Sequence, residues 1–201
     1  MEYFVYCRDR PGIGDLRREL AEDHWSFMDR YADALIARGP TLARDDAEAM
    51  TGSMHLVDLP DGVAARTFAF SEPYYTAGMF EEVLVRRWRN ALARTMWDFA
   101  GHGGRRFLVI AHGGPGATLR RTELRDEQLD YLLAGPSREG LIVFGPLLSE
   151  DGTDWLGTAM LVELANRTVV EALVEGSPYA RARLYDDVEI HSWRFGGRPQ
   201  N

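Results

Sequence analysis

The chain has 201 residues and a formal net charge of -8, and an acidic protein is repelled by a phosphate backbone, so we expect no nucleic-acid partner. All 23 basic residues are arginine, which excludes lysine Schiff-base chemistry. The single cysteine, Cys7, cannot form a disulfide within the chain, and no apolar run approaches membrane-spanning length, so we expect a cytoplasmic protein with no membrane partner.

The sequence repeats itself once, since residues 3–88 align with residues 107–193. The shared motifs are Tyr3-Phe4-Val5 with Phe107-Leu108-Val109, Pro11-Gly12 with Pro115-Gly116, Pro73-Tyr74 with Pro178-Tyr179, and Trp88 with Trp193. A repeat this long has the size of a small domain. We therefore predict one domain over residues 1–95, a linker over 96–105 and a second domain over 106–201.

Each copy is predicted to run strand, helix, strand, strand, helix, strand. Alternating or β-branched runs predict strands, and apolar residues at helical spacing predict helices. In the first copy the predicted elements are a strand over 3–8, a helix over 16–35, a turn at Gly39-Pro40, a strand over 53–59, a helix over 63–70 and a strand over 83–88. In the second copy they are strands over 107–112, 141–144, 158–164 and 188–193, a helix around 124–132, and a helix over 168–174 capped by Asn166.

This βαββαβ order is the ferredoxin-like motif, an α+β fold whose sheet carries helices on one face. The bare face of such a sheet needs cover, and a second copy in the same chain can supply it. The prediction is two tandem ferredoxin-like domains packed as a pseudo-dimeric α+β barrel, an intrachain pair, with a further homodimer left open. The apolar linker residues Met96, Trp97 and Phe99 suggest a segment packed on a domain, followed by a glycine-rich hinge.

His24 is the most informative candidate residue. Leu20, His24, Phe27 and Tyr31 fall on one helical stripe, which places a titratable ring on the buried face. The matching residue of the second copy is Gln128, so only the first copy can transfer protons there. The alternative is a hydrogen-bonded core histidine without a chemical role.

A carboxylate beside an imidazole fixes its tautomer and raises its basicity. Asp45, which follows the Gly39-Pro40 turn, is the candidate for this second catalytic position. The alternative is that Asp45 belongs to a solvated acidic loop.

Candidate substrate-binding residues are Tyr74, Glu72, His55 and Ser53. Tyr74 follows Pro73, where the second helix ends, and could present its phenol to a cleft. His55 and Ser53 share one face of a strand. Structural packing is the alternative for each, and no His, Cys or carboxylate spacing resembles a metal site, although His24, Asp45 and Glu72 are left open as partial ligands.

The order of these motifs resembles the YciI-like (YCII-related) domain family in both copies. The motifs are the opening strand with Asp9-Arg10-Pro11-Gly12, His24, Gly39-Pro40, Gly52-Ser53, Glu72-Pro73-Tyr74 and the closing strand to Trp88. The resemblance implies a ferredoxin-like fold related to the dimeric α+β barrels and a histidine–aspartate acid–base pair in a cleft. The histidine carries over to His24, and the acid to Asp45 or to Glu72, where the family usually has aspartate before Pro-Tyr.

The resemblance also implies a function, since at least one family member is a dehydrochlorinase. We expect a cofactor-free enzyme of lyase, dehydrochlorinase or isomerase type acting on a small aromatic or carbonyl-containing substrate. The second copy, with Gln128, is expected to be catalytically silent. The alternative from a different class is a non-catalytic module that binds a ligand or a partner.

Overall fold

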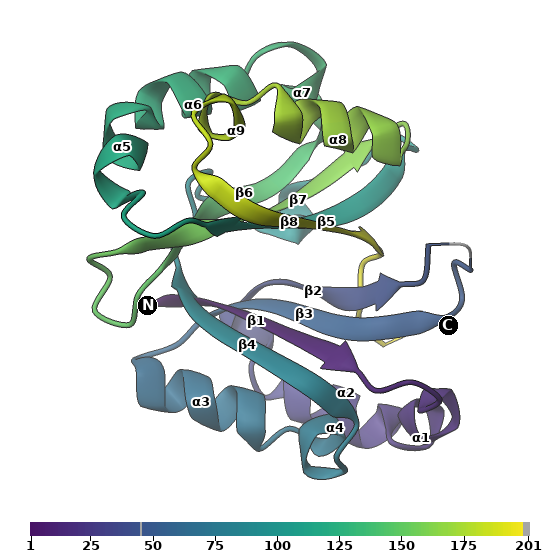
Figure 1. Ribbon diagram of the computed structural model, residues 1–201. Helices are drawn as coiled ribbons and strands as arrows, with labels where there is room; N and C mark the ends of the chain where they lie inside the picture. Colours follow the sequence, from purple (N-terminus) through teal and green to yellow (C-terminus); the bar gives the residue numbers. More distant parts are fainter. Residues whose placement is uncertain (45, 199–201) are drawn as a thin grey trace. The chain divides into compact units, whose positions relative to one another are not determined.

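The computed structural model describes residues 1–44 and 46–198, which fall into two compact units. One unit comprises residues 1–88 together with the segment from 193 onward, and the other comprises residues 89–192. In each unit the helices cover one face of a β-sheet (Figure 1).

The first unit has the predicted order of elements. Its strands are β1 (Glu2–Asp9), β2 (Leu35–Leu42), β3 (Met50–Asp58) and β4 (Phe80–Trp88). Its helices are α1 (Gly14–Glu19), α2 (Ala21–Asp29), α3 (Gly62–Phe70) and α4 (Pro73–Thr76), with a 3-10 turn, η1 (Ala32–Ala34). The sheet is antiparallel, in the order β4-β1-β3-β2.

The second unit repeats this plan. Its strands are β5 (Arg105–Gly113), β6 (Leu141–Leu148), β7 (Trp155–Leu164) and β8 (Tyr185–Trp193), and its antiparallel sheet has the order β8-β5-β7-β6. Its helices are α5 (Thr118–Glu123), α6 (Arg125–Leu132), α7 (Gly135–Gly140), α8 (Arg167–Glu175) and α9 (Pro178–Arg181). Both sheets therefore have the strand order of the ferredoxin-like motif.

The core of each unit lies between the sheet and its helices. In the first unit Val5, Phe27, Met28 and Phe68 are buried in one apolar cluster, and in the second unit Val109, Leu132, Val170 and Ile190 are buried in another. Alternation along the strands sends every second side chain to this face. The Asn166 side chain accepts a hydrogen bond from Val169 N at 3.1 Å, which confirms the predicted cap of α8.

Two local predictions were wrong. The predicted helix over 16–35 breaks at Leu20, whose ψ of 5° is not helical, so that α1 and α2 are separate helices and β2 already begins at Leu35. Gly39-Pro40 is part of β2 and forms no turn. A Cβ at Gly39 would collide with the carbonyl oxygen of Arg194, so the glycine is explained by the close approach of another backbone segment.

The segment after β4 packs on the second unit. Ala91 N donates to Phe144 O at 2.9 Å, and Met96 in the 3-10 turn η2 (Met96–Asp98) is almost fully buried. The expectation of a packed segment holds for Met96, whereas Trp97, which was expected to pack as well, is 55 % exposed. Within residues 1–44 and 46–198, the helices are all too short or too polar to cross a bilayer.

Candidate active site

His24 and Glu72 form a hydrogen-bonded pair in the first unit. His24 Nδ1 donates to Glu72 Oε2 at 2.9 Å. The other oxygen, Glu72 Oε1, accepts from Tyr75 N at 3.0 Å, because Glu72 caps the first turn of α4. The side chain of Glu72 is only 4 % exposed, and that of His24 is 12 % exposed. Both carboxylate oxygens are thus occupied, which fixes the orientation of the imidazole and leaves its Nε2 for a further partner.

Tyr74 supports the imidazole from one side. Its ring stacks on the His24 ring at a centroid distance of 4.2 Å with an interplanar angle of 9°. Its hydroxyl donates to Arg17 O at 3.2 Å. Burial raises the pKa of the Tyr74 phenol, so the group is a neutral donor at neutral pH.

His55 lies on the neighbouring strand β3, with its ring centroid 5.9 Å from that of His24. Burial lowers the pKa of His55 well below 6.5, and the positive charges of Arg38 and Arg17 act in the same direction. His55 is therefore neutral at neutral pH and can exchange hydrogen bonds but carries no charge.

A buried ion pair lies beside this group. Arg17 donates from Nε to Asp9 Oδ2 at 2.9 Å and from Nη2 to Asp9 Oδ1 at 3.1 Å, and Nη2 also donates to Ser53 Oγ at 2.7 Å. Its guanidinium carbon lies 4.7 Å from the centroid of the Tyr74 ring. Arg17 thus joins β1, β3 and the stacked pair of rings.

These residues line one cavity of about 1220 Å³. Among its lining residues are Asp9, Arg17, His24, Ser53, His55 and Tyr74. Further lining residues come from α1, α2, β2 and residues 194–198. A cavity of this size accommodates a small organic molecule beside the imidazole.

Residues 194–198 are tied to both β2 and α2. Gly196 N donates to Arg38 O at 2.9 Å. Arg198 contacts Glu22 Oε2 at 2.7 Å and Asp29 Oδ2 at 2.9 Å, both on the helix that carries His24. This segment therefore forms a wall of the cavity.

The second unit has a different arrangement at the matching positions. Gln128, which corresponds to His24, is buried, and its Oε1 accepts from Tyr179 N at 3.1 Å. Ser177 corresponds to Glu72 and caps α9. The space beside Gln128 and Ser177 measures only about 10 Å³. Trp155, where the first copy has Met50, is buried against Tyr179 and helps to fill this region.

The structure thus brings together His24, Glu72, Tyr74, His55 and Ser53 among the residues that the sequence identified as candidates. Asp45 lies outside the described residues. Sequence reasoning missed Arg17, which lies on α1, before the break at Leu20 that separates it from His24 on α2. Asp9 had been noted only as part of a motif.

Comparison with known proteins identifies the family. The family model of the YCII-related domain matches residues 1–89 and again residues 106–194. The chain belongs to the YCII-related domain family. It holds two copies of this domain, and the resemblance predicted from the sequence is confirmed.

One relative is an uncharacterized protein of Haemophilus influenzae, 29 % identical over 92 residues, which span 43 % of this chain and 94 % of that protein. Among solved structures, the chain is similar to a 5-chloro-2-hydroxyhydroquinone dehydrochlorinase from Burkholderia phenoliruptrix in complex with 2,5-dihydroxybenzoquinone. That match is 26 % identical, covers 47 % of this chain and 99 % of the other, and has a TM-score of 0.44.

A mutant chlorite dismutase from Candidatus Nitrospira defluvii matches over 96 % of this chain and 91 % of its own, with 10 % identity and a TM-score of 0.60. At this identity the likeness shows the fold alone. It confirms the predicted fold class, which is α+β with two ferredoxin-like copies.

Proposed function

We propose that the cavity of the first unit is the active site of a cofactor-free enzyme, with His24 as general acid–base and Glu72 as the residue that orients it. The observation that carries the proposal is the 2.9 Å pair of His24 Nδ1 and Glu72 Oε2 at the wall of a cavity of about 1220 Å³. The proposed substrate is a small aromatic or carbonyl-containing molecule, and the reaction is of lyase, dehydrochlorinase or isomerase type.

The proposed chemistry starts from the tautomer that Glu72 selects. With the proton on Nδ1, the lone pair of His24 Nε2 takes a proton from a carbon next to a substrate carbonyl. The electron pair of the broken C–H bond then forms an enolate. In an isomerisation His24 returns the proton to another carbon. In a dehydrochlorination this electron pair forms a double bond to the adjacent carbon, whose C–Cl bond breaks to release chloride, and His24 keeps the proton until solvent removes it.

Neighbouring residues suit substrate binding in this scheme. The stacked aromatic rings of His24 and Tyr74 suit further stacking with the planar ring of a substrate. Neutral His55 can donate a hydrogen bond to a substrate oxygen, and Ser53 is held by Arg17 at the same wall. A role for Asp45 stays a prediction.

The test is turnover of a panel of chlorinated hydroxyquinols and cyclic diketones, followed by proton NMR in deuterated water. Deuterium incorporation or loss of a substrate proton reports the proposed step. We expect His24→Gln, which copies the second unit, to lower turnover by about 10²–10⁴-fold. Glu72→Gln should lower it less, because the imidazole remains but its tautomer is no longer fixed. His102→Gln, a histidine of the other unit, is the matched control and should retain wild-type turnover.

Each result separates the hypotheses. Turnover that survives His24→Gln would show that the imidazole is not the acid–base group. A panel compound that binds with equal affinity to wild type and His24→Gln, and is turned over by neither, would favour the alternative of a ligand-binding module.

A further inference from the structure

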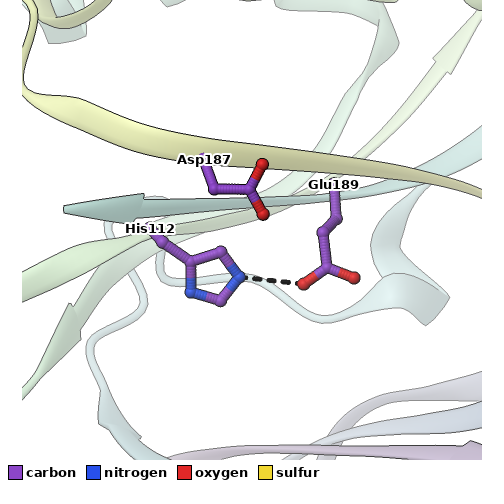
Figure 2. A group of neighbouring side chains, drawn as sticks. All are labelled: His112, Asp187 and Glu189. Carbon is purple, nitrogen blue, oxygen red and sulfur yellow. Dashed lines mark hydrogen bonds and ion pairs between the residues drawn. The ribbon is translucent and has the colours of Figure 1, made fainter.

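A second group of titratable side chains lies in the other unit. His112 on β5 and Asp187 and Glu189 on β8 place a ring nitrogen and two carboxylate oxygens within 4.8 Å of one another. Figure 2 shows the three side chains pointing toward a common space, with His112 Nε2 hydrogen-bonded to Glu189 Oε1 at 2.9 Å.

Strand register produces this arrangement. His112 pairs directly with Asp187 across the antiparallel β5–β8 ladder, and Glu189 is two residues further along. Because side chains alternate, all three lie on one face of the sheet. Val109 and Ile190 belong to the core beneath the helices and lie on the other face. The cluster is therefore on the sheet face that the unit's own helices do not cover.

A fourth group extends the cluster. His191, two residues beyond Glu189, places its Nε2 3.1 Å from Glu189 Oε2. Glu189 thus lies between two imidazoles, one from each strand. Two histidine nitrogens and two carboxylates form a mixed nitrogen and oxygen set of the kind that binds zinc and related divalent transition metals.

The first copy lacks this set at the matching positions. There Arg8 pairs with Glu82, with Nε and Oε2 3.4 Å apart, and Leu84 and Arg86 follow on the same strand face. A guanidinium has no lone pair for a metal. Arg8 and Glu82 form an ion pair in the first copy, but Leu84 and Arg86 provide no metal ligand where the second copy has Glu189 and His191.

We propose that His112, Asp187 and Glu189 bind a divalent transition metal ion, with His191 close enough to serve as a further ligand. Zinc is the expected ion, because imidazole and carboxylate suit it and its affinity for such sites exceeds that of manganese. The site belongs to residues 89–192 and does not depend on the proposed function of the first unit.

The experiment is calorimetric titration of the full chain, freed of metal by a chelator, with Zn²⁺ and separately with Mn²⁺. We expect one equivalent of Zn²⁺ to bind, more tightly than Mn²⁺. His112→Gln and Glu189→Gln should each weaken Zn²⁺ binding by about tenfold or more, because the loss of a group that supports a metal site has an effect of this size. His102→Gln and His24→Gln are controls that remove histidines outside the cluster and should leave the affinity unchanged.

A second readout keeps the test decisive if a variant is unstable. Visible absorption of Co²⁺ titrated into the wild-type chain should show an imidazole-ligated ion, and Zn²⁺ should displace it. Absence of Zn²⁺ binding to the wild type, or equal affinity in folded His112→Gln, would show that the cluster forms ion pairs only. Loss of binding in the His24→Gln control would place the metal in the first unit and overturn the proposal.

Discussion

Replacing Arg17 with methionine should lower the free energy of unfolding by about 3–5 kcal/mol at pH 7, the cost of breaking a buried ion pair by removing one partner. The side chains of Arg17 and Asp9 are 7 % and 3 % exposed. Arg17→Met removes both N–H donors to the Asp9 carboxylate and the donor to Ser53 Oγ. Because the Asp9 side chain is only 3 % exposed, the loss of these donors leaves its charge poorly compensated.

The loss should depend on pH. Burial raises the pKa of Asp9 above 3.8, and the Arg17 charge and hydrogen bond oppose that rise. Without Arg17 the pKa of Asp9 should rise further. A carboxyl with a raised folded-state pKa stabilises the protein fully below its unfolded value, and this contribution is lost as the pH rises through the folded value. The deficit of Arg17→Met should therefore be largest at pH 7 and shrink as the pH falls toward 4.

Urea unfolding followed by circular dichroism at pH 7 and at about pH 4.5 measures both effects. Arg18→Met is a matched control, since Arg18 is on the same helix with a side chain 74 % exposed, and it should change stability by less than about 0.5 kcal/mol. The double variant Arg17→Met with Asp9→Leu should recover most of the loss, because no charge remains buried. A cost below about 1 kcal/mol at pH 7, or a deficit that does not change with pH, would refute the reasoning.

Three further outcomes are expected. Because the folded-state pKa of His55 is depressed, its contribution to stability is present above pH 6.5 and is lost as the pH falls. The wild type should therefore lose stability between pH 7 and pH 5. His55→Asn should reduce this pH dependence by up to about 1.4 kcal/mol per pH unit, measured from urea unfolding midpoints. Gln128→Leu leaves the buried Tyr179 N–H without its acceptor and should cost about 1–3 kcal/mol in thermal or urea unfolding, with no change in the turnover assigned to the first unit. Gly39→Ala should displace the backbone at Arg194 and lower the free energy of unfolding by about 1–3 kcal/mol. It should also speed amide hydrogen exchange in residues 194–198, and unchanged exchange there would contradict the close approach described for Gly39.

Much of the fold follows from short-range patterns in the sequence. Alternation and β-branched residues predict the central parts of the strands, and the internal repeat predicts a second unit with the same strand order. The break at Leu20 was not predictable from spacing, because the apolar stripe continues through it at helical intervals. Gly39-Pro40 was misread as a turn because its cause, the backbone of Arg194, is remote in sequence.

The candidate site was predictable where the two copies differ. Aligning the repeat shows that His24 is matched by Gln128 and Glu72 by Ser177. The contact between His24 and Glu72, however, arises only from the packing of α2 against the start of α4. The cluster around His112 and Glu189 was not predictable in this way. Its members are 77 residues apart, and only the register of β5 on β8 brings them together.

The grouping of residues 193 onward with the first unit has a consequence for biosynthesis. The ribosome makes residues 1–88 first, then the whole of 89–192, and only then the segment that forms a wall of the His24 cavity. While the second unit is being translated, the first lacks the arginine that contacts Glu22 and Asp29 on α2. The nascent chain therefore carries the His24 cavity without this wall until residues 194–198 have been made.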